Sequence, residues 1–268
     1  MLPQLIHVSQ TGFIKERSIL DNLATFWELT ALAKKRKETL AVLMLDFEKA
    51  YDRVDWDFLH GTLLCFGFGE GWMRGIEALY SSATSRVLLI GQKGPLIQLT
   101  RSVRQGFPLA AFLFLSYGEA ISIYLNHMSI GLKGISLPIT KSAALDAEFA
   151  DDTGLYLAGS LHNLVKAEKA MGNFCKAAGA KINWHKTIGL WIGSLDPNFR
   201  SLPKGTPVRY LGYQVGLELT PEQKIALLLL TIRRKLLHWS AAKLSFAGRI
   251  VIANHVLLKP CGISSPTG

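Results

Sequence analysis

Residues 40–52 read LAVLMLDFEKAYD, and the apolar run at their start ends abruptly on Asp46. A short, continuously apolar run is typical of a strand that is buried on both faces of a sheet. Residues 147–157 show a related pattern, because strand-like residues flank the Asp151-Asp152 pair. We therefore predict a strand over 40–45, and a strand, turn and strand over 147–157, with carboxylates where the strands end.

Carboxylates gathered at strand ends repel one another unless a positive charge neutralises them. A pair of Mg²⁺ ions does this, because magnesium prefers oxygen ligands and two ions about 3.5–4 Å apart can hold the attacking and leaving oxygens of a phosphoryl transfer. Taken alone, Asp151-Asp152 is explained better as a turn signal and Asp46 as a strand terminator. Two such clusters on strands that can be neighbours favour a metal site.

The rest of the chain is expected to mix helices with short strands. Apolar spacing and capping residues predict helices over 18–37, 56–66, 108–126 and 160–179, and another that begins at Thr220-Pro221. Glycines and a Gly94-Pro95 pair predict a hairpin over 87–99. Because this order lacks regular βαβ alternation, the predicted fold class is α+β and not a doubly wound sheet.

The same spacing predicts which side chains are buried. On the helix over 18–37 we expect a buried face of Leu23, Phe26, Trp27 and Thr30. On the helix over 160–179 the expected stripe is Leu161, Leu164, Val165, Met171, Phe174 and Cys175. On the last helix the expected seam is Ile225, Leu228, Leu229, Ile232, Leu236 and Trp239.

The chain is basic, with a net charge of +10 and an isoelectric point near 9.6. Residues 201–268 hold nine Lys or Arg against two acidic residues, which is +7 of the +10. A basic surplus favours an acidic partner, and a concentrated one favours a surface that faces phosphates. The composition therefore points to nucleic acid as a partner.

Several classes of protein are disfavoured. Cys65, Cys175 and Cys261 are odd in number and far apart, so they suggest neither a disulfide framework nor a zinc site. The first residues lack the pattern of a secretory signal. Residues 108–125 are interrupted by polar residues and fall short of the roughly 20 that a membrane span needs. We expect an intracellular protein, in the nucleus or cytoplasm, without a membrane segment.

A series of motifs in chain order resembles the reverse transcriptases of non-long-terminal-repeat (LINE-type) retrotransposons. The motifs are QTGF at 10–13 with RSILDN at 17–22, LDFEKAYD at 45–52, RQGFPL at 104–109, FADD at 149–152, the segment from Gly179 to Lys186, and YLG at 210–212. Trp239 and LSFAGR at 244–249 are similar to a segment of the plant-type members. The matches run over almost the whole chain.

The resemblance implies a fold and an activity. The fold would be a polymerase palm of right-hand architecture, an antiparallel sheet with packed helices, with partial fingers and a helical thumb. Residues 1–196 would be partial fingers and palm, 197–207 a linker, and 208–268 the primer grip and a thumb-like region. The activity would be RNA-directed DNA synthesis with two Mg²⁺ ions. The partners would be an RNA template, a DNA primer and deoxynucleoside triphosphates.

The resemblance also implies roles around the acidic clusters. Asp46 and Asp151 would bridge both metal ions, Asp152 would complete the site, and the backbone of Phe47 would add an oxygen. Tyr51 corresponds to the bulky residue under the incoming sugar, where a ring excludes a 2′-hydroxyl. The alternative for Tyr51 is an aromatic residue of the core that follows a strand.

Further roles follow from the other motifs. Arg104, Gln105 and Gly106 would form the loop that holds the incoming nucleotide and the template, where a glycine permits close approach of the backbone. Lys186, or alternatively Lys181, would protonate the leaving pyrophosphate. The hairpin of Tyr210, Leu211 and Gly212 would grip the primer end, and the basic helical tail would follow the duplex backbone.

The chain departs from the family pattern at two places. It begins nine residues before Gln10, so the fingers hairpin with its triphosphate-binding arginine is expected to be missing, which would weaken catalysis. Residues 107–111 read FPLAA. At these positions the family usually has a small or polar residue followed by Pro-Leu-Ser-Pro. We therefore expect an altered turn before the helix. The family's endonuclease and terminal Cys/His knuckle are also not found.

These departures leave alternatives open. The chain could be a catalytically inactive remnant of such an element that still binds nucleic acid. It could also be a metal-dependent nuclease or another phosphotransferase with a two-carboxylate site, although the ordered motifs disfavour this.

Overall fold

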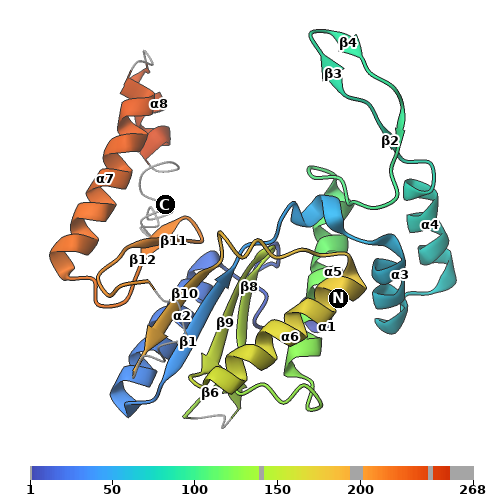
Figure 1. Ribbon diagram of the computed structural model, residues 1–268. Coiled ribbons are helices and arrows are strands. Elements are labelled where there is room, and N and C mark those ends of the chain that lie inside the picture. Colours follow the sequence, from blue (N-terminus) through green and yellow to red (C-terminus); the bar gives the residue numbers. More distant parts are fainter. Residues whose placement is uncertain (1, 139–141, 194–201, 241–243, 254–268) are drawn as a thin grey trace. The chain divides into compact units, whose positions relative to one another are not determined.

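The computed structural model of the chain describes residues 2–138, 142–193, 202–240 and 244–253 (Figure 1). The chain forms two compact units, Met1–Ser201 and Leu202–Gly268. Antiparallel sheet and packed helices in the first unit agree with the predicted α+β class. The predicted linker over 197–207 lies partly outside the described residues.

The first unit is built on a four-stranded sheet in the order β10-β1-β9-β8. Its strands are β10 (Ile188–Ile192), β1 (Leu40–Leu45), β9 (Asp152–Ala158) and β8 (Asp146–Phe149), and every pairing is antiparallel. β1 lies between two neighbours, and Leu40, Ala41 and Val42 are fully buried. The predicted strand over 40–45 and the strand, turn and strand over 147–157 are confirmed, whereas β10 was not predicted.

Helices cover both faces of this sheet. α2 (Ile19–Arg36) and α6 (Leu161–Ala178) lie on opposite sides of it (Figure 1). Because successive side chains of a strand point to opposite faces, Ala41 and Leu45 of β1 pack with α6 and its neighbouring helices, while Leu40 and Val42 face the other side. The core is thus formed by the sheet and the helix faces that cover it.

The ends of α2 and α6 follow from capping residues. Ser18 accepts a hydrogen bond from the amide of Leu20 and forms a capping box with Asp21. Ser160 accepts from the amide of Asn163, and α6 ends at Gly179, whose φ of +72° suits a glycine C-cap. The boundaries predicted for both helices are confirmed.

The buried faces of these helices are narrower than predicted. Trp27 is 51% exposed and Val165 is 55% exposed, and Leu161 is also exposed. Each helical residue turns about 100° from the one before it, so Trp27 and Val165 are turned away from the buried Phe26 and Leu164. The predictions for Trp27, Leu161 and Val165 were therefore wrong.

α5 (Pro108–Asn126) is the central helix of the unit. It contacts α3 (Trp56–Cys65) and α6, and Leu113 and Leu115 are almost completely buried. Its length and composition would suit a membrane span, but 61% of its most apolar 18-residue stretch is buried within the protein. The core helix of a globular protein can have the same length and composition. The predicted buried helix over 108–126 is confirmed.

Smaller elements surround this core. α1 (Leu2–Leu5) opens the chain, and α4 (Glu70–Tyr80), which was not predicted, follows α3. A projecting hairpin pairs β2 (Thr84–Ser85) with β5 (Ile97–Gln98) and β3 (Leu88–Leu89) with β4 (Gln92–Lys93), as predicted over 87–99 (Figure 1). β6 (Ile135–Ser136) pairs with β7 (Ala143–Ala144).

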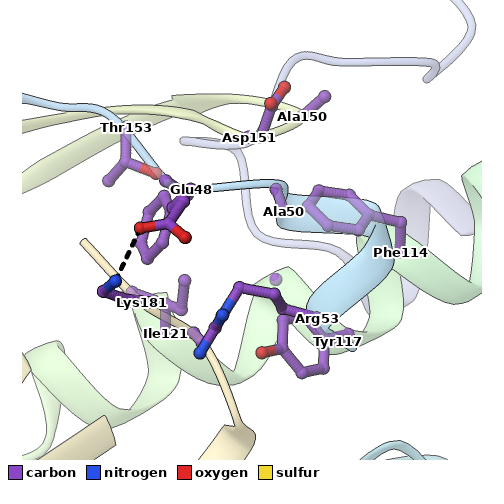
Figure 2. Close-up of a pocket in the computed structure, with 13 residues that line it drawn as sticks. Glu48, Ala50, Arg53, Phe114, Tyr117, Ile121, Ala150, Asp151, Thr153 and Lys181 are labelled. Carbon is purple, nitrogen blue, oxygen red and sulfur yellow. Dashed lines mark ion pairs between the residues drawn. The ribbon is translucent and has the colours of Figure 1, made fainter. Parts of the chain in front are cut away.

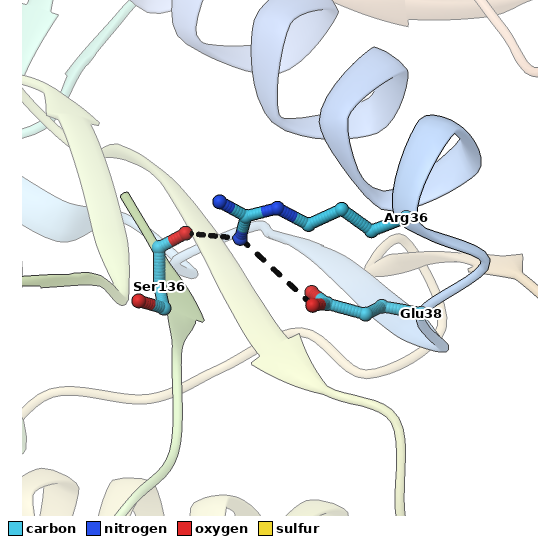
Figure 3. A network of polar contacts seen from close by, with 3 residues as sticks. All are labelled: Arg36, Glu38 and Ser136. Carbon is cyan, nitrogen blue, oxygen red and sulfur yellow. Dashed lines mark hydrogen bonds and ion pairs between the residues drawn. The ribbon is translucent and has the colours of Figure 1, made fainter. Parts of the chain in front are cut away.

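The C-terminal end of α2 is tied to β6 by an arginine. The Arg36 guanidinium donates a hydrogen bond of 2.6 Å to the Ser136 carbonyl oxygen and lies 3.8 Å from the Glu38 carboxylate (Figure 3). A cation at this position also interacts favourably with the helix dipole. This contact fixes the end of α2 just before β1 begins.

The second unit contains a hairpin and two helices. β11 (Val208–Tyr210) pairs with β12 (Tyr213–Val215), followed by α7 (Pro221–Ser240) and α8 (Phe246–Ile252). The predicted helix that begins at Thr220-Pro221 is confirmed. Part of the apolar seam predicted for α7 is exposed and not buried, namely Ile225, Leu228, Leu229 and Leu236.

Candidate active site

The two acidic clusters meet at one end of the central strands. β1 and β9 pair in a register that sets Leu45 opposite Thr153. β1 ends at Leu45 and β9 begins at Asp152, so Asp46 directly follows one strand of the pair and Asp152 is the first residue of the other. Asp151 precedes Asp152 in the turn from β8, and its side chain is exposed.

These carboxylates are near one another in the backbone, but their side chains do not converge. Within the described ranges of the chain, no three His, Cys, Asp or Glu side chains are grouped closely enough to hold a metal ion. Figure 2 shows the Asp151 carboxylate pointing away from the neighbouring Glu48–Lys181 ion pair. Carboxylate oxygens are donors of the kind that a divalent cation prefers.

The segment after Gly179 holds the backbone of Asp46 in place. The Asp46 carbonyl oxygen accepts a 2.7 Å hydrogen bond from the Asn183 amide. The Asp46 amide donates to the Thr187 hydroxyl at 3.4 Å, and Phe47 forms a bridge with Ile182. Because both backbone polar groups of Asp46 are engaged, its position at the strand end is fixed by contacts outside the sheet.

Lys181 and Lys186 have different surroundings on this segment. The Lys181 ammonium lies 2.8 Å from the Glu48 carboxylate (Figure 2). The hydrogen bond from Lys181 is the main cause that lowers the pKa of Glu48. Lys186 is exposed, and its amide donates to the Asn183 carbonyl oxygen. Lys181 is thus engaged by Glu48, whereas Lys186 presents its side chain at the surface beside Thr187.

Tyr51 packs against the core and lies near the acidic turn. Its ring stacks on Phe114 with the centroids 4.1 Å apart and the planes 12° from parallel. Burial, and to a lesser extent the charge of Asp151, raises the pKa of Tyr51. The stacking agrees with the interpretation as a core aromatic residue, while the influence of Asp151 agrees with a place beside the candidate site.

The loop of Arg104, Gln105 and Gly106 is exposed and anchored at its start. The Val103 amide donates a 2.9 Å hydrogen bond to the carbonyl oxygen of Tyr51, in the short turn η1 (Ala50–Arg53). Gly106 has a φ of +84°, a left-handed conformation that favours glycine. The loop therefore begins next to Tyr51 and is free to approach a ligand from the surface.

The turn before α5 is regular despite its departure from the family pattern. Phe107 is the N-cap residue and has no capping hydrogen bond from its side chain, and Pro108 occupies the first helical position. Proline is favoured there because that residue needs no amide donor. The sequence over 107–111 thus still starts a helix.

A small cavity lies behind the acidic turn. It has a volume of about 20 Å³ and is lined by Glu48, Arg53, Tyr117, Asp151 and Lys181 among others (Figure 2). This volume holds about one water molecule. A nucleotide would therefore have to bind on the open side of the strand ends and not in this cavity.

Buried acidic residues behind the turn were not predicted. Glu119 of α5 and Asp146 and Glu148 of β8 are all buried. Burial is the main cause that raises the pKa of Glu148 well above its usual range, followed by the charge of Asp146. Glu148 could have been recognised from the sequence as an acidic residue inside an apolar stretch of a predicted strand.

The hairpin of Tyr210, Leu211 and Gly212 belongs to the second unit. Leu211 and Gly212 both have positive φ, at +53° and +81°, as a tight two-residue turn requires. Tyr210 is buried, and Lys204 pairs with Glu218 at 2.8 Å. Arg233 and Arg234 are exposed on α7, so this unit presents basic groups at its surface.

Known proteins show clear similarity to the chain. A protein-family model described as "Reverse transcriptase (RNA-dependent DNA polymerase)" matches residues 1–215. The chain is 31% identical over 266 residues to the "Transposon TX1 uncharacterized 149 kDa protein" of Xenopus laevis, a match that covers 96% of this chain and 20% of that protein. It is 25% identical over 270 residues to the "Retrovirus-related Pol polyprotein from type-1 retrotransposable element R2" of Popillia japonica, which covers 87% and 37%.

Solved structures support the fold. The apo telomerase of Candida tropicalis truncated from its C-terminal domain has a TM-score of 0.53 at 19% identity, over 79% of this chain and 40% of that one. The telomerase of the same organism in complex with a fragment of telomeric RNA has a TM-score of 0.55 at 16% identity, over 80% and 34%. The chain spans well under half the length of each of these proteins.

Proposed function

Because this chain belongs to the reverse transcriptase family, we propose that it is the RNA-directed DNA polymerase domain of a non-long-terminal-repeat retrotransposon. The family uses divalent metal ions, and the donors at the strand ends are carboxylates of the kind that Mg²⁺ prefers. The observation that supports the proposal is the antiparallel pairing of β1 with β9, in which Leu45 lies opposite Thr153, so that Asp46 and Asp152 are the next residues along the two strands. This arrangement lies within the part of the chain that the family model matches.

The proposed reaction joins a deoxynucleotide to a primer on an RNA template. The primer 3′-hydroxyl oxygen loses its proton to water and forms a bond to the α-phosphorus of the nucleotide, while the bond from that phosphorus to the pyrophosphate oxygen breaks. We assign Asp46 and Asp151 as ligands of two Mg²⁺ ions, with Asp152 and the Phe47 carbonyl oxygen as further donors. When bound, these ions would acidify the attacking hydroxyl and neutralise the charge that develops on the phosphates.

The other residues of the site are assigned roles in binding and proton transfer. Tyr51 would exclude a 2′-hydroxyl from the sugar position, and the exposed loop of Arg104, Gln105 and Gly106 would hold the nucleotide and the template. Lys186 would donate a proton to the leaving pyrophosphate. It is favoured over Lys181, because the Glu48 carboxylate lies 2.8 Å from the Lys181 ammonium.

The remaining assignments concern the whole chain. We propose that residues 1–196 form partial fingers and palm, that 197–207 form a linker, and that 208–268 carry the primer grip at Tyr210, Leu211 and Gly212 and a thumb-like region. The basic groups of this last region would contact the phosphates of the duplex. The substrates would be an RNA template, a DNA primer and deoxynucleoside triphosphates inside the cell, in the nucleus or cytoplasm.

A second candidate is a remnant that binds nucleic acid without catalysis. It is favoured by one observation, that the carboxylate side chains of the described residues do not converge into a metal-binding group. In this case the basic groups of the chain would still attract an RNA–DNA duplex, because phosphate contacts do not require the acidic site.

Primer extension on an RNA template with Mg²⁺ distinguishes the two candidates. The polymerase proposal predicts extension by the wild-type chain and its loss in Asp151→Asn, because the variant removes a charged ligand and leaves the shape of the side chain. Asp57→Asn is the matched control, since Asp57 is an exposed residue of α3. Duplex binding without any extension by the wild-type chain would support the remnant, and undiminished synthesis by Asp151→Asn would refute the ligand assignment.

A further inference from the structure

The QTGF motif at 10–13 lies against the turn that carries Asp151. The backbone amide of Thr11 donates to the Glu148 carbonyl oxygen and the Glu148 amide donates to Ser9, both at 2.8 Å. This segment therefore runs alongside β8 and reaches the turn at Ala150. The phenyl ring of Phe13 also lies 6.5 Å from that of Phe149.

Ala150 adopts a backbone conformation that costs energy. Its φ of +54° lies in the left-handed region, which costs a non-glycine residue about 1–2 kcal/mol. Ala150 directly precedes Asp151, so its φ and ψ set the direction in which Asp151 and Asp152 leave β8. Such a conformation persists only where the surrounding structure holds it.

The side chain of Gln10 supplies this support. Gln10 is 0% exposed, and its amide oxygen accepts a 2.9 Å hydrogen bond from the Ala150 backbone amide. Its amide nitrogen donates to the Ala150 carbonyl oxygen at 3.4 Å and to the Glu148 carboxylate at 3.2 Å. One side chain thus bonds both backbone polar groups of the residue that forms the turn.

Gly12 also packs closely against Ala150. A Cβ atom at Gly12 would lie 2.6 Å from the Ala150 backbone nitrogen, closer than real Cβ atoms come. The Gly12 amide also donates a 2.9 Å hydrogen bond to the Gln10 amide oxygen. Arg17 anchors the segment, since its guanidinium donates to the carbonyl oxygens of Gln10 at 2.7 Å and Ile6 at 3.0 Å.

We infer that Gln10 and Gly12 form a clamp that positions the acidic turn for catalysis. Neither residue touches a substrate in this scheme, so both are positioning residues that act through Ala150 on Asp151 and Asp152. The inference rests on the proposed polymerase function for its catalytic consequence. Its structural part, the hold of Gln10 on Ala150, does not depend on activity.

The structural part is tested by hydrogen exchange in the wild-type chain and in Gln10→Leu, which keeps a bulky side chain but removes the amide. We expect the Ala150 amide to be strongly protected in the wild type and to exchange at least about tenfold faster in the variant, because its buried acceptor is lost. An Ala150 amide that exchanges freely in the wild type, or equally in both proteins, would overturn the clamp. This measurement on the wild type stands even where a variant fails to fold.

The catalytic part compares Gln10→Leu and Gly12→Ala with Thr11→Val. Thr11 is a buried neighbour whose hydroxyl donates to Asn22 at 2.9 Å and to the Glu148 carbonyl oxygen at 3.3 Å, and its side chain makes no hydrogen bond to Ala150. Thr11→Val should therefore lower thermal stability without changing kcat. In the two clamp variants kcat should fall by about 100-fold, as a misplacement near 1 Å can cause, while KM and duplex binding stay within about threefold.

The readouts separate the inference from the proposed function. Manganese binding, measured by electron paramagnetic resonance, should weaken in the clamp variants and not in Thr11→Val. If the wild type binds Mn²⁺ but makes no DNA, the polymerase proposal fails while the exchange and Mn²⁺ measurements still decide the clamp. If all three variants lose kcat equally and retain Mn²⁺ affinity, the positioning role is refuted.

Discussion

The buried carboxyl of Glu119 provides a direct test of the structure by its pH dependence. Glu119 is 2% exposed, and its carboxylate accepts a 2.9 Å hydrogen bond from the His7 amide. Burial, more than any other cause, raises the pKa of this carboxyl from 4.5 to about 7. The nearby Asp146 charge adds to the rise, while the His7 amide and the charge of Arg17 oppose it.

The sign of the effect follows from proton linkage. Between the unfolded value of 4.5 and the folded value of about 7, the folded state binds more protons than the unfolded state, so the free energy of unfolding falls as the pH rises. Each pH unit corresponds to about 1.4 kcal/mol, and the interval from 4.5 to about 7 therefore corresponds to at most about 3 kcal/mol. The stability is fully present below the unfolded pKa and is lost by about pH 7.

Glu119→Gln should remove this dependence. Glutamine keeps an oxygen that can accept the His7 amide and carries no charge at any pH. Urea unfolding at a series of pH values between about 4 and 8 should show little difference near the acid end. The variant should be up to about 3 kcal/mol more stable than the wild type at the alkaline end.

The exposed Glu28 of α2 supplies the control, and Glu28→Gln should leave the pH dependence of the wild type unchanged. The charge of Glu119 also contributes to the raised pKa of Glu148, so the difference between Glu119→Gln and the wild type includes this coupling. A Glu119→Gln variant that tracks the wild type at every pH would show that Glu119 is solvated or paired in solution, and the described packing of α5 against the first residues would then be wrong.

Three further predictions concern the site and its supports. Tyr51→Ala should raise the incorporation of ribonucleotides relative to deoxynucleotides by at least about tenfold in primer extension, and unchanged sugar discrimination would remove the steric role from Tyr51. Lys186→Ala should slow nucleotide addition by about 100-fold and flatten the alkaline limb of its pH–rate profile, whereas a larger loss in Lys181→Ala would assign the proton donor to Lys181 instead. Gly179→Ala should destabilise the chain by about 1–2 kcal/mol in thermal unfolding, because its φ is +72°, while Gly172→Ala, in an open position inside α6, should be neutral or stabilising.

Local signals in the sequence were sufficient for most elements of the first unit. The strand over 40–45 was predictable because six apolar residues in a row leave few alternatives to a strand buried on both faces. The ends of α2 and α6 were predictable because Ser18, Ser160 and Gly179 cap helices through contacts within a few residues. α4 was missed, and no strand was predicted at 188–192.

The acidic residues of the candidate site were identified from the sequence, but their mutual placement was not. Asp46 and Asp152 were expected at strand ends because each borders an apolar stretch. That they lie at the same end of the sheet depends on the register of β1 with β9, which backbone hydrogen bonds between distant segments determine.

The sequence by itself determined most elements of the first unit, the acidic clusters and the family motifs, since each depends on residues that are close along the chain. Only the tertiary structure decided which of these residues act on one another. Trp27 and Val165 are exposed because they lie on the sides of their helices that the rest of the fold leaves uncovered. The Gln10 side chain forms hydrogen bonds with Ala150, which is 140 residues later in the chain, because the fold brings the segment of Gln10 alongside β8. Such contacts arise from packing across the fold, which no local pattern encodes, and they place the turn that carries Asp151.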